Sequence, residues 1–143
     1  TVMLEATSHG FRRAGQPEPR LFRGLAGELD PAAQFGAATA DHAVFSYSLS
    51  MIEEPVGAIE RAVGHLAPAG RLHIVDFGAM DRLPRMLAAS MRRWLAMFGV
   101  RHRPEIGPTL EGLAHAKGGR VERRSIANGY AELLRLTLVP KGD

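Results

Sequence analysis

Ser46, Tyr47 and Ser48 follow directly on the apolar run 43–45 in the stretch DHAVFSYSLSMI. Polar or small residues also follow two other short apolar segments, at 24–26 (GLA) and 76–78 (DFG). In open α/β sheets, ligands bind beyond the carboxyl ends of parallel strands, where the chain leaves the sheet and its polar groups become free. The pattern therefore predicts three strand ends that face one ligand-binding crevice.

Each strand end also has a plainer explanation, because polar residues terminate strands and cap the helices that follow them. A serine nucleophile has little support, since no Gly-x-Ser-x-Gly elbow surrounds Ser46, Ser48 or Ser50. The histidines do not share one helical face at a spacing that suits metal coordination, so the sequence assigns no metal site. They are His9, His42, His65, His73, His102 and His115.

The composition of the chain is that of an ordinary globular domain. Its 143 residues are 45% hydrophobic and 23% charged, which suits one core and a single domain over residues 1–143. Cysteine is absent, which excludes a disulfide framework and fits a reducing, cytoplasmic compartment. No apolar run approaches the roughly 20 residues of a membrane-spanning helix. The formal net charge of +3 gives no indication of a nucleic-acid partner.

Short apolar runs alternate with helical stretches along the chain, which predicts an α/β fold. Apolar residues at spacings of three and four predict an amphipathic helix over 55–66. Asn128-Gly129 separates the last two apolar segments, which are expected to be antiparallel strands. The predicted helices cover 2–14, 55–66, 83–98 and 108–117, with a turn or short helix over 25–29. The predicted strands cover 20–24, 43–46, 71–77, 121–126 and 132–139.

Three motifs succeed one another in a recognisable order: GLAGEL (24–29), DHAVFSYSLSMI (41–52) and HLAPAGRLHIVDFG (65–78). This succession resembles the later half of class I S-adenosylmethionine-dependent methyltransferases, where a strand, an amphipathic helix and an LxPGGxLxxxD turn and strand recur. Pro68-Ala69-Gly70 stands where that family usually has Pro-Gly-Gly. FSYSLSMI, IVDFG, RWLAMFGV and NGYAELLRL are similar, more narrowly, to betaine-lipid headgroup N-methyltransferases. The resemblance covers almost the whole chain.

The resemblance implies that S-adenosylmethionine is the cofactor and that a small-molecule or lipid-headgroup amine accepts the methyl group by in-line attack on the sulfonium. The implied cofactor-binding residues are Gly24, Leu25 and Ala26, against the adenine, and Ser46 and Tyr47, at the methionine end. Many relatives have an acid where Leu25 stands, so its contact would come from the backbone. The resemblance also implies that Tyr47 or a water would take the proton of the amine. It implies that Ser48, Asp76 and Phe77 would border the acceptor.

One part of the family pattern is not found. The Gly-rich turn after the first strand, which brings backbone N–H groups to the cofactor, has no counterpart in the sequence, nor has the acid that ends the second strand. The resemblance therefore implies a Rossmann-like sheet that lacks its first two strands and is mostly parallel with an antiparallel C-terminal hairpin. The chain is expected to be a partial methyltransferase domain with an incomplete cofactor site.

The missing strands affect the strand at Ala43 to Ser46. The family's complete sheet has the strand order 3-2-1-4-5-7-6, so this normally central strand is expected to become an exposed edge. The predicted strand at 20–24 is then expected to close up beside it, to pair across a homodimer or to be poorly ordered. The edge also supports a second hypothesis for function, a non-catalytic remnant or interaction domain that binds a partner there.

The helix predicted over 83–98 separates apolar from basic side chains. The simplest interpretation is a helix packed on a sheet with its basic side in solvent. The alternative is peripheral membrane contact, in which the arginines meet anionic lipid headgroups. The apolar side holds Leu83, Leu87, Met91, Trp94, Leu95 and Phe98, and the basic side holds Arg82, Arg85, Arg92 and Arg93.

Overall fold

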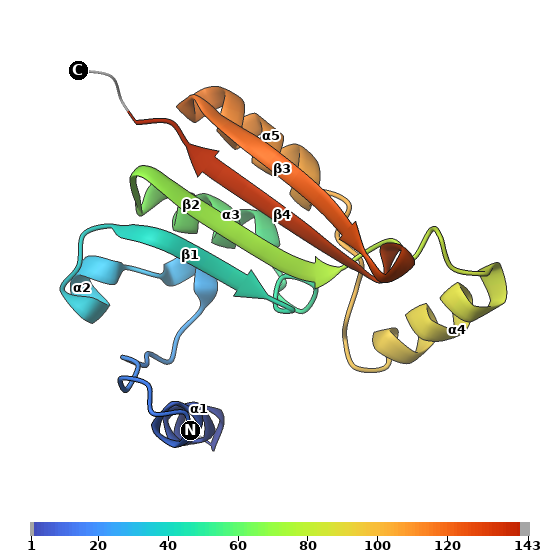
Figure 1. Ribbon diagram of the computed structural model, residues 1–143, viewed down its shortest axis with the longest axis horizontal. Coiled ribbons are helices and arrows are strands. Elements are labelled where there is room, and N and C mark those ends of the chain that lie inside the picture. The colour runs from blue at the N-terminus through green and yellow to red at the C-terminus, as the bar shows by residue number, and fades with distance from the viewer. Residues whose placement is uncertain (1, 141–143) are drawn as a thin grey trace.

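The computed structural model describes residues 2–140, which form an α/β fold built on one four-stranded sheet (Figure 1). The strands are β1 (Ala40–Ser46), β2 (Leu66–Phe77), β3 (Gly119–Ile126) and β4 (Ala131–Leu138). The helices are α1 (Val2–Arg13), α2 (Pro31–Phe35), α3 (Pro55–Gly64), α4 (Arg85–Ala96) and α5 (Ile106–Lys117), with short 3-10 helices η1 (Ala26–Glu28) and η2 (Ala127–Gly129). The predicted alternation of strands and helices is confirmed from β1 onward.

The strands lie in the order β1-β2-β4-β3. β1 and β2 are parallel, with Ser46 opposite Val75, whereas β4 runs antiparallel to both β2 and β3. This is the order 4-5-7-6 expected for the later half of the methyltransferase sheet, and the C-terminal hairpin is confirmed. In the described sheet one pair is parallel and two pairs are antiparallel. β1 forms one edge of it, as predicted.

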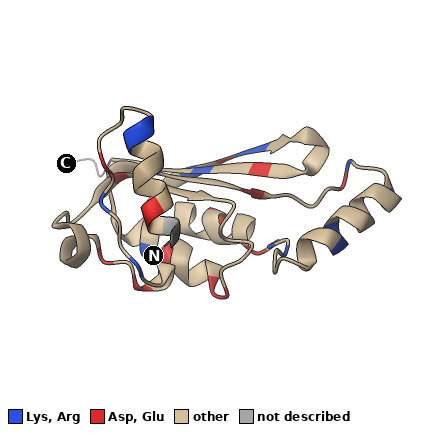
Figure 2. Ribbon diagram, turned by 90° about the horizontal axis from the view of Figure 1, so that it is seen from below, with Lys and Arg blue, Asp and Glu red and all other residues tan. Residues whose placement is uncertain are grey.

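Both long helices that pack on the sheet lie on the same face. Figure 2 shows α3 and α5 below the sheet, and within the described residues no helix covers the opposite face. The side chains alternate accordingly along β2, where Leu72 and Ile74 are buried and Val75 is only half-buried. The core lies between this face and the two helices, and includes Leu49, Ile59, Val63, Leu72, Ile74, Leu110, Leu134 and Leu136.

A tight turn interrupts the pairing near the start of β2. Ala40 lies opposite Leu66, but pairing resumes only at His42 opposite Arg71, so residues 67–70 bulge out. The predicted turn at 68–70 is therefore present, within a strand that begins earlier than expected. Ala69 has a left-handed backbone, with φ 64°. A side chain at Gly70 would place its Cβ 2.7 Å from the Ala67 carbonyl oxygen, so only glycine fits there.

The segment before β1 differs most from the sequence prediction. Residues 20–24 are irregular, so the expected strand is wrong, and of the three alternatives the one in which it closes up beside β1 is not found. A strand needs a neighbour to pair its backbone groups, and residues 20–24 do not pair with the open edge of β1 or with any other described strand. The short helix expected over 25–29 is confirmed as η1. The sequence interpretation missed α2, which Asp30 caps by accepting hydrogen bonds from the N–H groups of Ala32 and Ala33.

Helix α4 lies beyond the ends of β2 and β4 and away from the sheet face, as Figure 1 shows. Its buried residues, Ala88 and Leu95, pack with Met80 and Val100 in a small second cluster. Leu87, Trp94 and Phe98 are exposed, so the interpretation that α4 packs its apolar side on the sheet is wrong. In the described chain, no helix is long and apolar enough to cross a membrane.

Candidate functional site

The ends of β1 and β2 meet at Tyr47. Its backbone N–H donates to the carbonyl oxygen of Val75 at 2.7 Å, and its ring centroid lies 5.0 Å from that of Phe77. Phe77 in turn contacts Tyr130, with centroids 5.6 Å apart. Two of the three predicted strand ends are thus brought together, with an aromatic cluster between them.

Tyr47 has an unusual backbone. Its φ is 49°, in the left-handed region that side chains other than glycine rarely occupy, and its side chain is 40% exposed. Ser46 pairs with Val75 immediately before it, on the parallel side of the sheet. Strained backbone of this kind clusters at functional sites, where the surrounding structure holds it in place. The strain therefore favours Tyr47 as part of a binding site.

Asp76 joins the ends of β1 and β2, and its contact with an acceptor stays a prediction. The carboxylate is buried, and it accepts hydrogen bonds from the backbone N–H groups of Ser50, at 2.9 Å, and Phe77, at 2.8 Å. Ser48 begins a turn in the segment after β1, because its carbonyl oxygen accepts hydrogen bonds from the N–H groups of Met51 and Ile52. Asp76 thus holds the segment after β1 against the end of β2, and both of its oxygens are engaged in doing so.

The third predicted strand end is not brought to this place. Gly24 and Leu25 lie in irregular chain, where Leu25 is largely exposed, and Ala26 begins η1. η1 packs against α3, and the guanidinium of Arg61, near the end of that helix, donates to the carbonyl oxygen of Leu29 at 2.6 Å. No strand end lies there in the described structure, and adenine binding by these residues stays a prediction.

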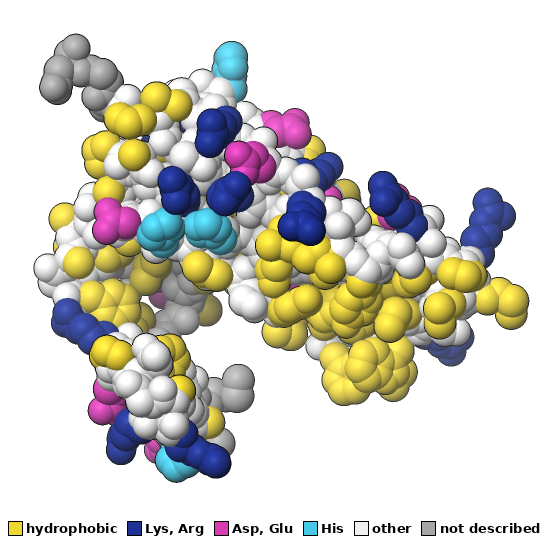
Figure 3. Space-filling model, viewed as in Figure 1, with side chains coloured by type: hydrophobic (Ala, Val, Ile, Leu, Met, Phe, Trp, Pro, Cys, Tyr) yellow, Lys and Arg dark blue, Asp and Glu magenta, His cyan; other side chains and the backbone are white. Residues whose placement is uncertain are grey.

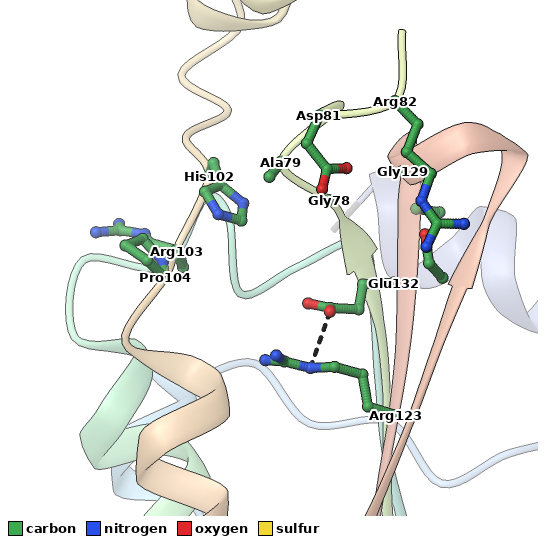
Figure 4. Close-up of a pocket in the computed structure, with 12 residues that line it drawn as sticks. Gly78, Ala79, Asp81, Arg82, His102, Arg103, Pro104, Arg123, Gly129 and Glu132 are labelled. Carbon is green, nitrogen blue, oxygen red and sulfur yellow. Dashed lines mark ion pairs between the residues drawn. The ribbon is translucent and has the colours of Figure 1, made fainter.

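A polar cavity of about 290 Å³ opens beyond the end of β2, and the sequence analysis missed it. Asp81, His102 and Glu132 point toward it from three separate segments, as Figure 4 shows. In the sequence, His102 is only one of the histidines that show no metal spacing, and the two acids give no local signal. The residues are far apart in sequence, so only the pairing of β2 with β4 and the path of the loop before α5 bring them together.

The polar groups of this cavity differ in how they are paired. Glu132 forms an ion pair with Arg123, with Nε of the arginine 2.9 Å from Oε1 of the glutamate. Asp81 forms no ion pair with the residues drawn in Figure 4. Nδ1 of His102 lies 3.4 Å from the carbonyl oxygen of Phe77. The tautomer that donates from Nδ1 to this carbonyl leaves Nε2 free to accept a proton. The cavity therefore combines carboxylates with a group that can act as a base.

The described residues contain no group of three or more His, Asp or Glu side chains that could hold a metal ion.

The surroundings of β1 test whether S-adenosylmethionine suits this chain. Val44 is 67% exposed, and in the described sheet β1 has β2 as its single neighbour. Ser46, Tyr47 and Phe77 supply hydroxyl and aromatic groups at the ends of β1 and β2, which suit part of such a ligand, and their contact with it stays a prediction. The Gly-rich turn and the acid that contact the ligand elsewhere in the family are not in the sequence.

No protein-family model and no curated protein sequence matches the chain, but many solved structures do. An O-methyltransferase family protein from Burkholderia thailandensis is 22% identical, with a TM-score of 0.65 over 97% of this chain and 40% of that chain. A SAM dependent methyltransferase from Aquifex aeolicus is 17% identical, with a TM-score of 0.62 over 96% of this chain and 64% of that chain. The N-methyltransferase NodS from Bradyrhizobium japonicum is 18% identical, with a TM-score of 0.57 over 97% and 71%.

The chain spans less than two thirds of the length of the first two of these proteins. The agreement extends to the order and direction of the strands, which are those expected for the later half of the methyltransferase sheet. On this evidence, the chain has the fold of class I S-adenosylmethionine-dependent methyltransferases and corresponds to its later, C-terminal part.

Proposed function

We propose that the protein transfers a methyl group from S-adenosylmethionine to the amine of a small molecule or lipid headgroup. The observation that carries the proposal is the meeting of the parallel β1 and β2 ends, where Tyr47 lies against Phe77 in a fold shared with solved methyltransferases. The structures that this chain resembles include both the N-methyltransferase NodS and an O-methyltransferase family protein, so the choice of an amine rests on the sequence resemblance.

The residues at these strand ends suit the methionine side of the cofactor. When bound, S-adenosylmethionine supplies an electrophilic methyl group on a sulfonium. Ser46 and Tyr47 would line this part of the site, and Phe77 and Tyr130 would provide an apolar wall that excludes water. The hydroxyl of Tyr47 or Nε2 of His102 would take the proton of the amine. Gly24, Leu25 and Ala26 are proposed, on the resemblance alone, to meet the adenine.

The polar cavity beyond β2 suits the acceptor. The lining holds charges of both signs, two carboxylates (Asp81 and Glu132) and three arginines (Arg82, Arg103 and Arg123). Arg123 pairs with Glu132, so Asp81 is the carboxylate that would meet the amine of the acceptor. Ser48 and Phe77 would border the acceptor on the β1 side, with Asp76 holding that loop in place. A lipid headgroup would be reached at a membrane surface, which agrees with the exposure of Arg82, Arg85, Arg92 and Arg93.

A second candidate function rests on the exposed edge of the sheet. β1 has an unpaired outer side in the described structure, where its backbone groups have no strand partner. Exposed strand edges pair readily with other strands. A non-catalytic interaction domain that adds a partner strand to β1, or pairs with a second copy of itself, would use this feature.

Calorimetry with S-adenosylhomocysteine tests the proposal. We expect weak or no binding to residues 1–143 alone, because most hydrogen-bonding partners of such a ligand belong to the Gly-rich turn and the second strand. A polypeptide extended upstream to include a Gly-rich turn is expected to bind the ligand and to methylate amines from a lipid extract. An extended polypeptide with that turn but without binding would refute the proposal. Upstream coding sequence without the turn would favour the interaction domain.

Tyr47→Phe in the extended polypeptide tests the role of the hydroxyl. The ring contact with Phe77 survives this change, so ligand binding and folding are expected to remain. The rate constant kcat is expected to fall by about 10²-fold if the hydroxyl takes the proton. His102→Gln is the matched variant for the alternative base, and the larger fall in kcat identifies the group that acts.

A further inference from the structure

Helix α4 exposes a continuous apolar surface, which we call the α4 apolar face. The exposed fractions of its side chains range from 52% to 87%, and the rings of Trp94 and Phe98 contact each other at 5.0 Å. At about 100° per residue, the members within α4 fall in roughly a third of the helix circumference, and the last two, Met97 and Phe98, follow in the turn after the helix. The α4 apolar face consists of Met86, Leu87, Trp94, Met97 and Phe98.

The protein core does not use this surface. The side of α4 that is buried carries Ala88, Met91 and Leu95, which pack with Met80 and Val100 beyond the end of β2. The α4 apolar face points elsewhere, and Figure 3 shows hydrophobic side chains gathered over the part of the molecule that α4 occupies. Exposed apolar patches of this kind mark binding surfaces in soluble proteins.

The charge around the same helix is strongly one-sided. Residues 82–104 contain no Asp or Glu, and their arginines are Arg82, Arg85, Arg92, Arg93, Arg101 and Arg103. The whole chain carries +3, so the residues outside this segment have a net charge of −3. The basic charge of the protein is thus concentrated on the segment that also carries its largest exposed apolar side chains.

We propose that α4 lies on an anionic lipid surface, with its apolar face in the boundary between headgroups and acyl chains and its arginines at the lipid phosphates. Interfacial helices have this composition, with Trp, Phe and Leu on one side and arginine on the other. α4 is 12 residues long, about 18 Å, which is too short to span a bilayer but suits a helix in the plane of its surface.

The arginines also argue against a second copy of the chain as the occupant. Two copies packed through their α4 apolar faces would leave both sets of arginines without an opposite charge, because the arginines lie on the other side of the helix. An anionic surface offers the opposite charge and an apolar layer at once. The proposal does not require methyl transfer, and its test does not measure it.

Trp94 is the single tryptophan of the chain, so its fluorescence reports directly on the α4 apolar face. We expect vesicles of phosphatidylcholine with 30% phosphatidylglycerol to shift its emission to the blue and brominated lipids to quench it. Partitioning is expected to be about tenfold or more weaker on vesicles of phosphatidylcholine alone, because each arginine near an anionic surface favours binding. Equal partitioning on both vesicles, or none on either, would overturn the proposal.

Variants identify the surface. Leu87→Ser with Phe98→Ser should abolish binding while Trp94 remains as reporter, and the fold should survive because both side chains are exposed. Arg82→Gln with Arg85→Gln and Arg93→Gln should remove the preference for anionic vesicles. The matched controls change exposed residues elsewhere: Leu25→Ser with Val139→Ser, and Arg13→Gln with Arg23→Gln and Arg124→Gln.

Two further outcomes count against the proposal. Retained binding in the Leu87→Ser, Phe98→Ser variant with unchanged circular dichroism would place the lipid contact elsewhere. A blue shift that grows with protein concentration in the absence of vesicles, and that the same variant removes, would assign the α4 apolar face to a second copy.

Discussion

The carboxylate of Asp76 accepts a hydrogen bond from the backbone N–H of Ser50 at 2.9 Å, which ties the segment after β1 to the end of β2. Its other oxygen accepts from the N–H of Phe77. The side chain is only 6% exposed, so both bonds form away from water. We expect Asp76→Asn to lower the free energy of unfolding by about 1–3 kcal/mol, because an amide cannot accept in both places. Urea denaturation followed by circular dichroism measures this change.

Asp41→Asn is the matched control, because Asp41 is exposed on β1. Its effect is expected to stay within about 0.5 kcal/mol, as for most surface substitutions. Equal stability of the Asp76→Asn and Asp41→Asn variants would show that the two hydrogen bonds do not stabilise the strand ends.

Ala69 gives a second prediction, because its backbone is left-handed and methyltransferases of the family that the chain resembles usually have glycine at this position. Its φ of 64° is strained for any residue with a Cβ. We expect Ala69→Gly to raise the free energy of unfolding by roughly 0.5–1 kcal/mol, since relief of this strain exceeds the added entropy of the unfolded chain. Urea denaturation measures this change, as a shift in the urea concentration at the midpoint of unfolding while the slope of the free energy against urea stays the same.

Ala67→Gly is the control for this change, because Ala67 is in the same bulge but its backbone is not left-handed. It should lower stability, by the usual cost of glycine in extended chain. Stabilisation by both substitutions, or by neither, would mean that the backbone of Ala69 is not strained in solution.

The turn at Ala69 could be predicted from the sequence, whereas the irregular segment at 20–24 could not. The motif HLAPAGRLHIVDFG was enough to predict the turn and the strand after it, because proline, glycine and alternating apolar residues act locally. The same reasoning predicted a strand at 20–24, where RLFRG has suitable residues. A strand forms only with a partner, and local pattern does not show whether one is present.

The candidate site divides in the same way. The meeting of Tyr47 with Phe77 could be predicted, because both follow parallel strands and such strands end at one edge of a sheet. The cavity with Asp81, His102 and Glu132 could not, since these residues become neighbours only through strand pairing and a long connection. In α4, periodicity correctly separated apolar from basic residues but could not show what would cover the apolar side.

His73 predicts a pH dependence of stability. On the open face of the sheet, partial burial is the largest cause that lowers its pKa, and the charges of His42, Arg135 and Arg71 lower it further. The unfolded chain therefore takes up a proton at higher pH than the folded protein does. Stability should fall as the pH drops below about 6.5, the ordinary pKa of histidine. Urea denaturation at pH 7.5 and pH 5.5 measures the loss.

Variants at this pair separate the causes. His73→Gln should remove the part of the stability loss that comes from His73 between the two pH values. His42→Gln should reduce that part, because the charge of His42 lowers the pKa of His73 and the two ring nitrogens, Nδ1 of His42 and Nε2 of His73, are 3.2 Å apart. His115→Gln, which removes an exposed imidazole on α5, is the control. An unchanged pH dependence in His73→Gln would show that the titration of His73 does not contribute.

The edge position of β1 predicts self-association. Its outer backbone groups lack a strand partner in the described sheet, and Val44, in the middle of the strand, is an exposed apolar residue. We expect sedimentation velocity to show concentration-dependent dimers, and Val44→Lys to weaken them by about tenfold or more, because lysine on an edge strand opposes pairing. Val139→Lys places the same charge on another exposed valine, beyond the end of β4, and should leave association unchanged. If the chain stays monomeric at all concentrations, the edge of β1 is not an interface between copies. If Val44→Lys and Val139→Lys weaken association equally, the change in net charge is the cause.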